Sequence, residues 1–355
     1  MEEEIKSRGG YLLKDLAKSF IQCLGETGPI ASGKILHFTA DMVTSGGLQL
    51  WEKLCWDYAY EHIGVASPRI FHFLNKKFHE LNELSSKMQL DVFYRRKEIQ
   101  EQLAEIVLIL QNCPKKTKCK MPSVSPDTHE NETWLRSMLR TTDKMAVRKV
   151  YQRNSDLEPM LHAGNEMVYA IQEGAPERAL FWIKWMLEED AILKKKFGSG
   201  LTTVERGPAY FKPQQKTSVG YYIIAILAEV YKEFAEKGMV RMHEEFQALL
   251  DIYRSIHTQR KKLDIIAIMV QILTDVPKWK VPAAPSLVLD QTKLQRAVSQ
   301  AESFFREILL LPLPRKLLPA TVTGIKKKVK EPSKQNKLEQ QLAMIDEVTM
   351  NFYRI

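Results

Sequence analysis

One stretch of the sequence, residues 164–190, predicts two helices joined by a tight turn. Gly174 marks the turn, and Pro176 stands at the first position of the second helix, where its missing N–H has no helical partner to lose. We expect this second helix to end near Asp190. Its apolar residues leave few positions that suit water: Leu180, Trp182, Ile183, Trp185, Met186 and Leu187. Because such a helix must be covered by other helices, it predicts an all-α body built around a central helix.

Helical periodicity continues through most of the chain, which predicts a multi-helix bundle. Residues 48–63 form one expected helix, and Ser67 is expected to cap the next, with Pro68 at its first position. Further helices are expected over residues 91–110, 133–153, 218–237, 241–274 and 290–311. Four tryptophans are expected in the core: Trp51, Trp56, Trp182 and Trp185.

Two segments rich in proline and lysine divide the chain. Residues 112–130 hold three prolines and four lysines without periodicity, which is typical of a linker. We expect this linker to join an N-terminal helical half, 1–111, to a C-terminal helical domain, 131–311. The tail, 312–355, is expected to be extended and basic, with a short amphipathic helix at its end. Tails of this kind often present a peptide to another protein, so a protein partner is expected here.

Charge and cysteine content limit the environment of the protein. The formal charge of +9 and the pI of about 9.1 favour polyanionic partners. No apolar run is long enough for a membrane span, and the acidic start is unlike a secretory signal. The four cysteines are too few for a disulfide framework, which favours a reducing, intracellular compartment. Cys113 and Cys119 have the wrong spacing for a zinc knuckle and no histidine pair beside them, so no metal is expected.

A basic ladder is the main candidate for a binding site. Its four residues recur every fourth position of the expected helix 133–153 and would share one ridge: Arg136, Arg140, Lys144 and Arg148. Such a ridge suits contact with successive phosphates of DNA. Two alternatives remain open: the ladder is a solvated face paired with acidic residues such as Glu188 and Glu189, or residues 141–143 interrupt the helix. The tail adds a second candidate, Lys326, Lys327 and Lys328.

Gly28, Gly33 and Lys34 match the spacing of a phosphate-binding P-loop. That motif also needs a preceding strand and a Ser or Thr after the lysine to bind magnesium. Here a helical pattern precedes the glycines and Ile35 follows the lysine, so no nucleotide site and no cofactor are expected.

The long loop that follows the central helix leaves two readings open. Arg206, Tyr210, Phe211 and Lys212 either stack on and neutralise single-stranded nucleic acid or belong to an ordered cover over the helices.

No acid–base pair is readable in the sequence. Glu61 beside His62, and Glu166 in the central stretch, have no convergent partner at a readable spacing, so no catalytic residue is expected.

Two motifs resemble the helical collar domains of DNA clamp loaders and of related bacterial AAA+ genome-stability ATPases. Ala170, Ile171 and Gly174, followed by a helix with paired aromatics, resemble a segment in which a helix ends A-I-x-x-G. Residues 59–69, AYEHIGVASPR, are similar to a stretch of the form A-x-E-x-I-G-x-A-x-P-R. In those ATPases the second motif follows the first, whereas here it precedes it. Two related collar-like halves would reconcile the order.

The resemblance implies a collar-type helical body that oligomerises and works near DNA. It does not imply ATPase activity, because the ATPase module of a clamp loader has no counterpart in this sequence. The sequence as a whole also looks like a conserved protein of large nucleocytoplasmic DNA viruses.

Together these features predict a non-enzymatic, DNA-binding accessory protein of viral DNA replication or late transcription. It is expected to form a homo- or hetero-oligomer in the host nucleus or a cytoplasmic virus factory. The alternative is a structural or packaging protein of the virus particle. A particle component is stoichiometric in purified particles, whereas an accessory protein is scarce there.

Overall fold

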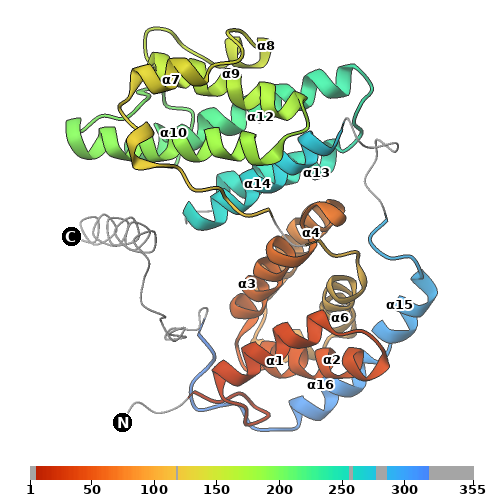
Figure 1. Cartoon of the computed structure of the whole chain (residues 1–355). Helices are drawn as coiled ribbons and strands as arrows, with labels where there is room; N and C mark the ends of the chain where they lie inside the picture. The colour runs from red at the N-terminus through yellow and green to blue at the C-terminus, as the bar shows by residue number, and fades with distance from the viewer. Residues whose placement is uncertain (1–4, 117–118, 256–258, 277–285, 320–355) are drawn as a thin grey trace. The chain divides into compact units, whose positions relative to one another are not determined.

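Helices form the regular secondary structure of the described part of the chain, residues 5–116, 119–255, 259–276 and 286–319 of a computed structural model. Extended pairing in these residues is limited to two isolated bridges, Lys6 with Leu12 and Asp156 with Thr202. The predicted all-α class is therefore confirmed (Figure 1).

The first helices are α1 (Leu13–Gly25), α2 (Pro29–Thr44), α3 (Leu48–Tyr58), α4 (Arg69–Ser85), α5 (Leu90–Arg95) and α6 (Lys97–Asn112). A π-helical turn, Ala59–Ile63, and a 3₁₀ turn, Gly64–Ala66, connect α3 to α4. The helices that follow the linker are α7 (Glu132–Met138), α8 (Met145–Arg148), α9 (Glu158–Gln172), α10 (Pro176–Phe197), α11 (Pro213–Lys216), α12 (Val219–Glu236), α13 (His243–Ser255) and α14 (Gln259–Asp275). The last two are α15 (Gln291–Val298) and α16 (Ala301–Leu309).

The hairpin of α9 and α10 is the centre of the C-terminal helices, as the sequence predicts. Gly174 adopts a φ of 64° at the turn, where a residue with a side chain would be strained. Helix α10 packs on α9, α12 and α14, and Trp182 and Trp185 are buried in it. It runs seven residues beyond Asp190, because the Lys194 ammonium pairs with the Asp190 carboxylate one turn earlier and Gly198, at φ 76°, ends the helix.

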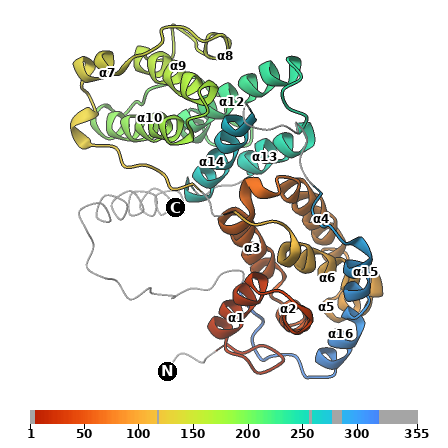
Figure 2. The same cartoon turned by 45° about the vertical axis from the view of Figure 1, so that its right-hand side comes forward.

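The last two helices pack on the N-terminal half of the chain. Helix α15 contacts α6, and α16 contacts α2, α5 and α6. Figures 1 and 2 show both blue helices beside the red and orange ones. They bury the apolar positions Leu294, Val298, Phe305 and Ile308. The structure thus places residues 291–309 against the N-terminal helices, and not among the C-terminal helices as their order in the sequence suggested. Residues 1–320 form one compact unit, and the tail beyond them is a second unit outside the described residues.

The prediction of one continuous helix over residues 133–153 is wrong. Helix α7 ends at Met138, residues 139–144 form an extended loop, and α8 is a single turn. Side chains of α9 bind the backbone of this loop and replace the hydrogen bonds of a continuous helix. The four basic residues therefore do not share one ridge.

Two smaller expectations also fail. The Ser67 hydroxyl donates to the carbonyl of Pro114 at 3.4 Å and does not cap α4, whose N-cap position is Pro68. Trp51 is buried, but Trp56 is only half-buried, because it lies beside a cleft and stacks on Tyr60 with a ring separation of 5.6 Å.

Candidate polyanion-binding site

Two cations lie over one tyrosine ring. The ammonium of Lys144 is 5.0 Å from the centre of the Tyr169 ring, and the guanidinium carbon of Arg178 is 5.6 Å from it. Tyr169 belongs to α9 and Arg178 to the first turn of α10, so the turn at Gly174 brings them side by side. Lys144 enters from the loop before α8. Three segments thus meet at one aromatic ring, whose negative face attracts cations.

The loop that carries Lys144 is fixed by two buried side chains of α9. The Glu166 carboxylate accepts the N–H groups of Arg140 and of Thr141, the latter at 2.8 Å. The amide oxygen of Asn165 accepts the N–H of Lys144 at 3.0 Å, and its amide nitrogen donates to the carbonyl of Thr142 at 2.9 Å. Residues 140–144 are therefore held along α9 by four hydrogen bonds, which fix where the Lys144 side chain begins.

No carboxylate among the described residues pairs with the two cations of this cluster. The Lys144 ammonium donates to the neutral side-chain oxygen of Gln172 at 2.7 Å. Arg178 forms no ion pair among the described residues, and its Nη2 is buried without a hydrogen-bond partner. The acidic residues nearest to it in sequence, Glu173 and Glu177, are exposed and do not pair with it. Buried donors in proteins nearly always have an acceptor, so an anion would complete the site.

The ladder residues have different partners. Arg136 pairs with Glu132 at 2.6 Å, and Arg148 pairs with Asp143. The exposed side chain of Arg140 has no ion pair in the described chain, and its backbone belongs to the same loop as Lys144. Two ladder residues are therefore ion-paired, Lys144 lies over Tyr169, and Arg140 is exposed on the loop that carries Lys144. Lys326, Lys327 and Lys328 lie outside the described residues.

Glu188 and Glu189, which one of the two open alternatives paired with the ladder, bind His129. Its Nδ1 lies 2.8 Å from Glu189 Oε2, and its Nε2 lies 3.4 Å from Glu188 Oε2. The imidazole stacks on the Trp185 ring. Burial alone would lower the pKa of His129, but hydrogen bonds and charge from both glutamates outweigh it and raise the pKa to about 9.

The loop after α10 is an ordered cover at two of its named residues. Arg206 pairs with the buried carboxylate of Asp156 and donates to the Val150 carbonyl at 3.1 Å. Phe211 is buried. Tyr210 is 71 % exposed, although its hydroxyl donates to the Arg254 carbonyl at 3.2 Å. Arg206 is thus committed to the fold, which favours the cover over a nucleic-acid contact.

Sequence reasoning missed a buried lysine, Lys262. Its ammonium lies 4.8 Å from the ring centre of Tyr221, 5.0 Å from Tyr253 and 5.5 Å from Phe211. Within the described residues it donates a hydrogen bond to the Tyr221 hydroxyl at 3.3 Å. Burial lowers the pKa of Lys262 to about 8. Sequence periodicity could not predict this cluster, because its rings come from three separate segments.

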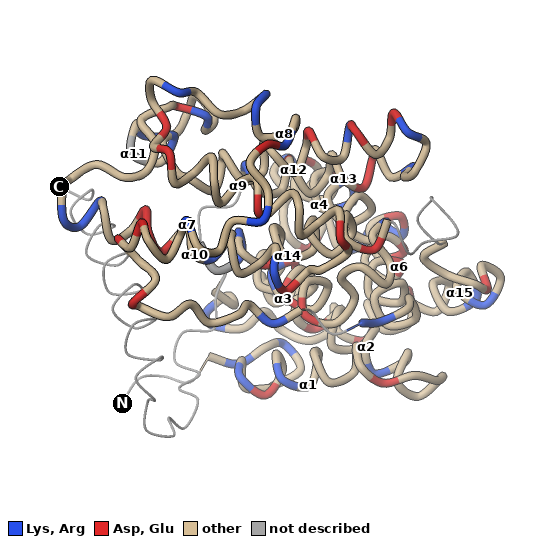
Figure 3. Tube along the Cα trace, turned by 45° about the horizontal axis from the view of Figure 1, so that its top comes forward, with Lys and Arg blue, Asp and Glu red and all other residues tan. Residues whose placement is uncertain are grey.

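Among the described residues, no group of three His, Cys, Asp or Glu side chains is placed to hold a metal ion, and the four cysteines are free. No helix in the described part of the chain is long and apolar enough to cross a bilayer. Figure 3 shows basic and acidic residues interspersed along the described chain in that view, so the site rests on local pairing, not on a broad basic face.

Comparison with known proteins gives no relative: no family model, no curated protein and no solved structure matches the chain. The resemblance to clamp-loader collars stays a prediction.

Proposed function

We propose that this protein is a non-enzymatic, DNA-associated accessory that binds the phosphate backbone through Lys144 and Arg178, which lie over Tyr169, together with the exposed Arg140 of the same loop as Lys144. The observation that carries the proposal is the pair of cations over Tyr169, which no carboxylate neutralises in the described chain. Phosphate oxygens supply the acceptors that this pair lacks, and a guanidinium binds phosphate with defined geometry.

Backbone binding also fits the excess of basic residues and the lack of a readable catalytic pair. The collar and viral resemblances support a role for this protein in viral DNA replication or late transcription. They also support its assembly into an oligomer. Contacts of this kind do not read base sequence, so the protein is expected to bind unrelated duplexes alike.

The test is the salt dependence of duplex binding. Each phosphate neutralised adds about 0.9 to the slope of log affinity against log salt concentration, so the double variant Lys144→Gln/Arg178→Gln should flatten the slope by nearly two units. The matched control, Arg136→Gln/Arg148→Gln, removes the same charge from ion-paired sites and should change the slope little.

Fluorescence anisotropy on two unrelated duplexes at several salt concentrations measures both slopes. Equal slopes in the two double variants would reject the Tyr169 cluster as the binding site. A melt of each variant excludes unfolding as the cause of a lost affinity.

A further inference from the structure

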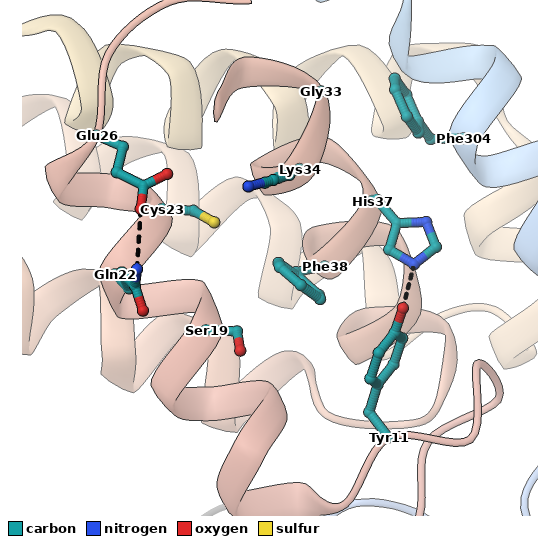
Figure 4. Close-up of a pocket in the computed structure, with 10 residues that line it drawn as sticks. All are labelled: Tyr11, Ser19, Gln22, Cys23, Glu26, Gly33, Lys34, His37, Phe38 and Phe304. Carbon is teal, nitrogen blue, oxygen red and sulfur yellow. Dashed lines mark hydrogen bonds between the residues drawn. The ribbon is translucent and has the colours of Figure 1, made fainter. Parts of the chain in front are cut away.

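A cleft of about 480 Å³ lies between α1 and α2, away from the residues of the Tyr169 cluster. Its walls are Ser19, Gln22 and Cys23 from α1 and Lys34 and Phe38 from α2, which face one another in Figure 4. Clefts of several hundred cubic ångströms are the usual size of small-ligand sites.

Lys34 supplies a cation that pairs with no carboxylate among the described residues, although Glu26 also lines the cleft. It is exposed at the cleft and forms no ion pair or hydrogen bond with the described residues. Its ammonium points into the hollow, toward the Cys23 thiol (Figure 4). Burial and the charge of Glu26 raise the pKa of that thiol, against a lowering by Lys34, so the thiol stays neutral. The Glu26 carboxylate accepts the Gln22 amide at 3.0 Å instead of pairing with Lys34.

Aromatic rings form the rest of the lining. Phe38 packs edge-on against Tyr11 and His37, with ring centres 5.6 Å and 5.7 Å apart. Phe304 of α16 lies on the other side, where Gly33 leaves the helix without a side chain. A methyl group built on Gly33 would stand 3.7 Å from the Phe304 ring, so the ring lies close to this turn of α2 and the glycine leaves the space between them open. A flat apolar group therefore finds rings on two sides of the cleft.

We infer that this cleft binds a small ligand made of a flat ring and one anionic group, a phosphate monoester or a carboxylate. The anion contacts Lys34, with the Ser19 hydroxyl as a second donor. The ring packs on Phe38 and toward Phe304. A nucleoside triphosphate is a poor fit. Lys34 is the single Lys or Arg among the described residues that line the cleft, and Gly33 and Lys34 belong to a helix, not to a phosphate-binding loop.

The experiment uses the full chain and phenyl phosphate as the probe, followed by saturation-transfer NMR of the ring protons. Benzoate tests the carboxylate alternative. Benzyl alcohol, observed through its own ring protons, and inorganic phosphate, added as a competitor of phenyl phosphate, test whether ring and anion are both needed. We expect phenyl phosphate or benzoate to bind more tightly than either fragment. Lys34→Gln should raise the Kd of the preferred probe about tenfold, as expected for a charge-assisted hydrogen bond.

Lys237→Gln is the matched control, since Lys237 is exposed on the C-terminal helices and also lacks an ion pair in the described chain. A second variant, Ser19→Phe, fills the cleft without changing charge and should abolish binding. Equal Kd values for the Lys34 and Lys237 variants, or no binding of any probe, would overturn the inference.

The inference is independent of duplex binding. Lys34→Gln should leave the salt slope on DNA unchanged, so either proposal is able to fail without the other.

Discussion

The carboxylate of Glu166 on α9 accepts the N–H of Thr141 at 2.8 Å, at the point where the predicted helix 133–153 is interrupted. Glu166 is buried and also accepts the N–H of Arg140. Glu166, which was considered as an acid or base and set aside, thus holds a loop in place. The same contacts place Lys144 over Tyr169, so the fold of the loop and the geometry of the proposed site have one origin.

Replacing Glu166 with alanine should therefore loosen the site. Glu166→Ala leaves two backbone N–H groups without their acceptor, and we expect the free energy of unfolding to fall by about 1.5–3 kcal/mol. Duplex affinity should fall as well, although no cation is removed. Urea unfolding and anisotropy measure the two effects. Glu173→Ala, an exposed change at the C-terminal end of the same helix, is the control and should alter neither.

His129 predicts a loss of stability in mildly alkaline solution. Its folded pKa of about 9 exceeds the ordinary value of 6.5, so the folded state binds the proton more tightly than the unfolded state. The stabilisation is complete below pH 6.5 and is lost as the pH rises through 9. His129→Gln should remove this dependence. Unfolding free energies measured from pH 6 to 9.5 test it, and an identical pH profile for the variant would contradict the assignment.

Lys262 predicts the opposite trend over a higher range. Its folded pKa of about 8 lies below the ordinary value of 10.5, because burial disfavours the charged form. The unfolded state therefore binds more protons between these values, and stability should rise with pH from about 8 to 10.5. Lys262→Met keeps an unbranched side chain and should abolish the rise. The pH ranges of the His129 and Lys262 trends overlap between 8 and 9. Comparing His129→Gln with Lys262→Met separates the two contributions there.

Local sequence patterns predicted one part of the C-terminal helices and failed for another. The α9–α10 hairpin was predictable because Gly174, Pro176 and the apolar run act within one short stretch. The loop 139–144 was not, because its hydrogen-bond acceptors, Asn165 and Glu166, lie more than twenty residues away. Nothing in the local pattern weighs a helical hydrogen bond against such a distant carboxylate.

The candidate site was predictable only in part. Arg140 and Lys144 were predicted because they recur every fourth residue, but the structure has no continuous helix here that would align them. Arg178 was overlooked because it lies in a helix read as core. One signal was available: Tyr169 and Arg178 lie at similar distances from the turn at Gly174, so an antiparallel hairpin brings them together. The return of α15 and α16 to the N-terminal helices has no local signal at all.

Trp182 tests the central role of α10. It is 4 % exposed and contacts the rings of Phe181, Trp134 and Trp185. Trp182→Ala should lower the free energy of unfolding by about 3–5 kcal/mol, because a large cavity is left in the core. Trp56→Ala, at a half-buried position, should cost less. A thermal melt of both variants measures the difference. Equal losses of stability would contradict the central position of α10 in the core.

Tyr169 separates the arrangement of the cations from their number. Tyr169→Leu keeps Arg140, Lys144 and Arg178 and removes only the ring on which two of them lie. Because the same phosphates are neutralised, the salt slope of duplex binding should stay that of the parent protein. The affinity at any one salt concentration should fall about three- to tenfold, because the cations must then be ordered on binding. Tyr169→Phe retains the ring face and should bind as the parent does. If the leucine variant binds DNA with the parent's affinity, the ring does not position the cations. If its slope falls with its affinity, the cluster has lost phosphate contacts, and Tyr169 takes part in binding beyond holding the two side chains.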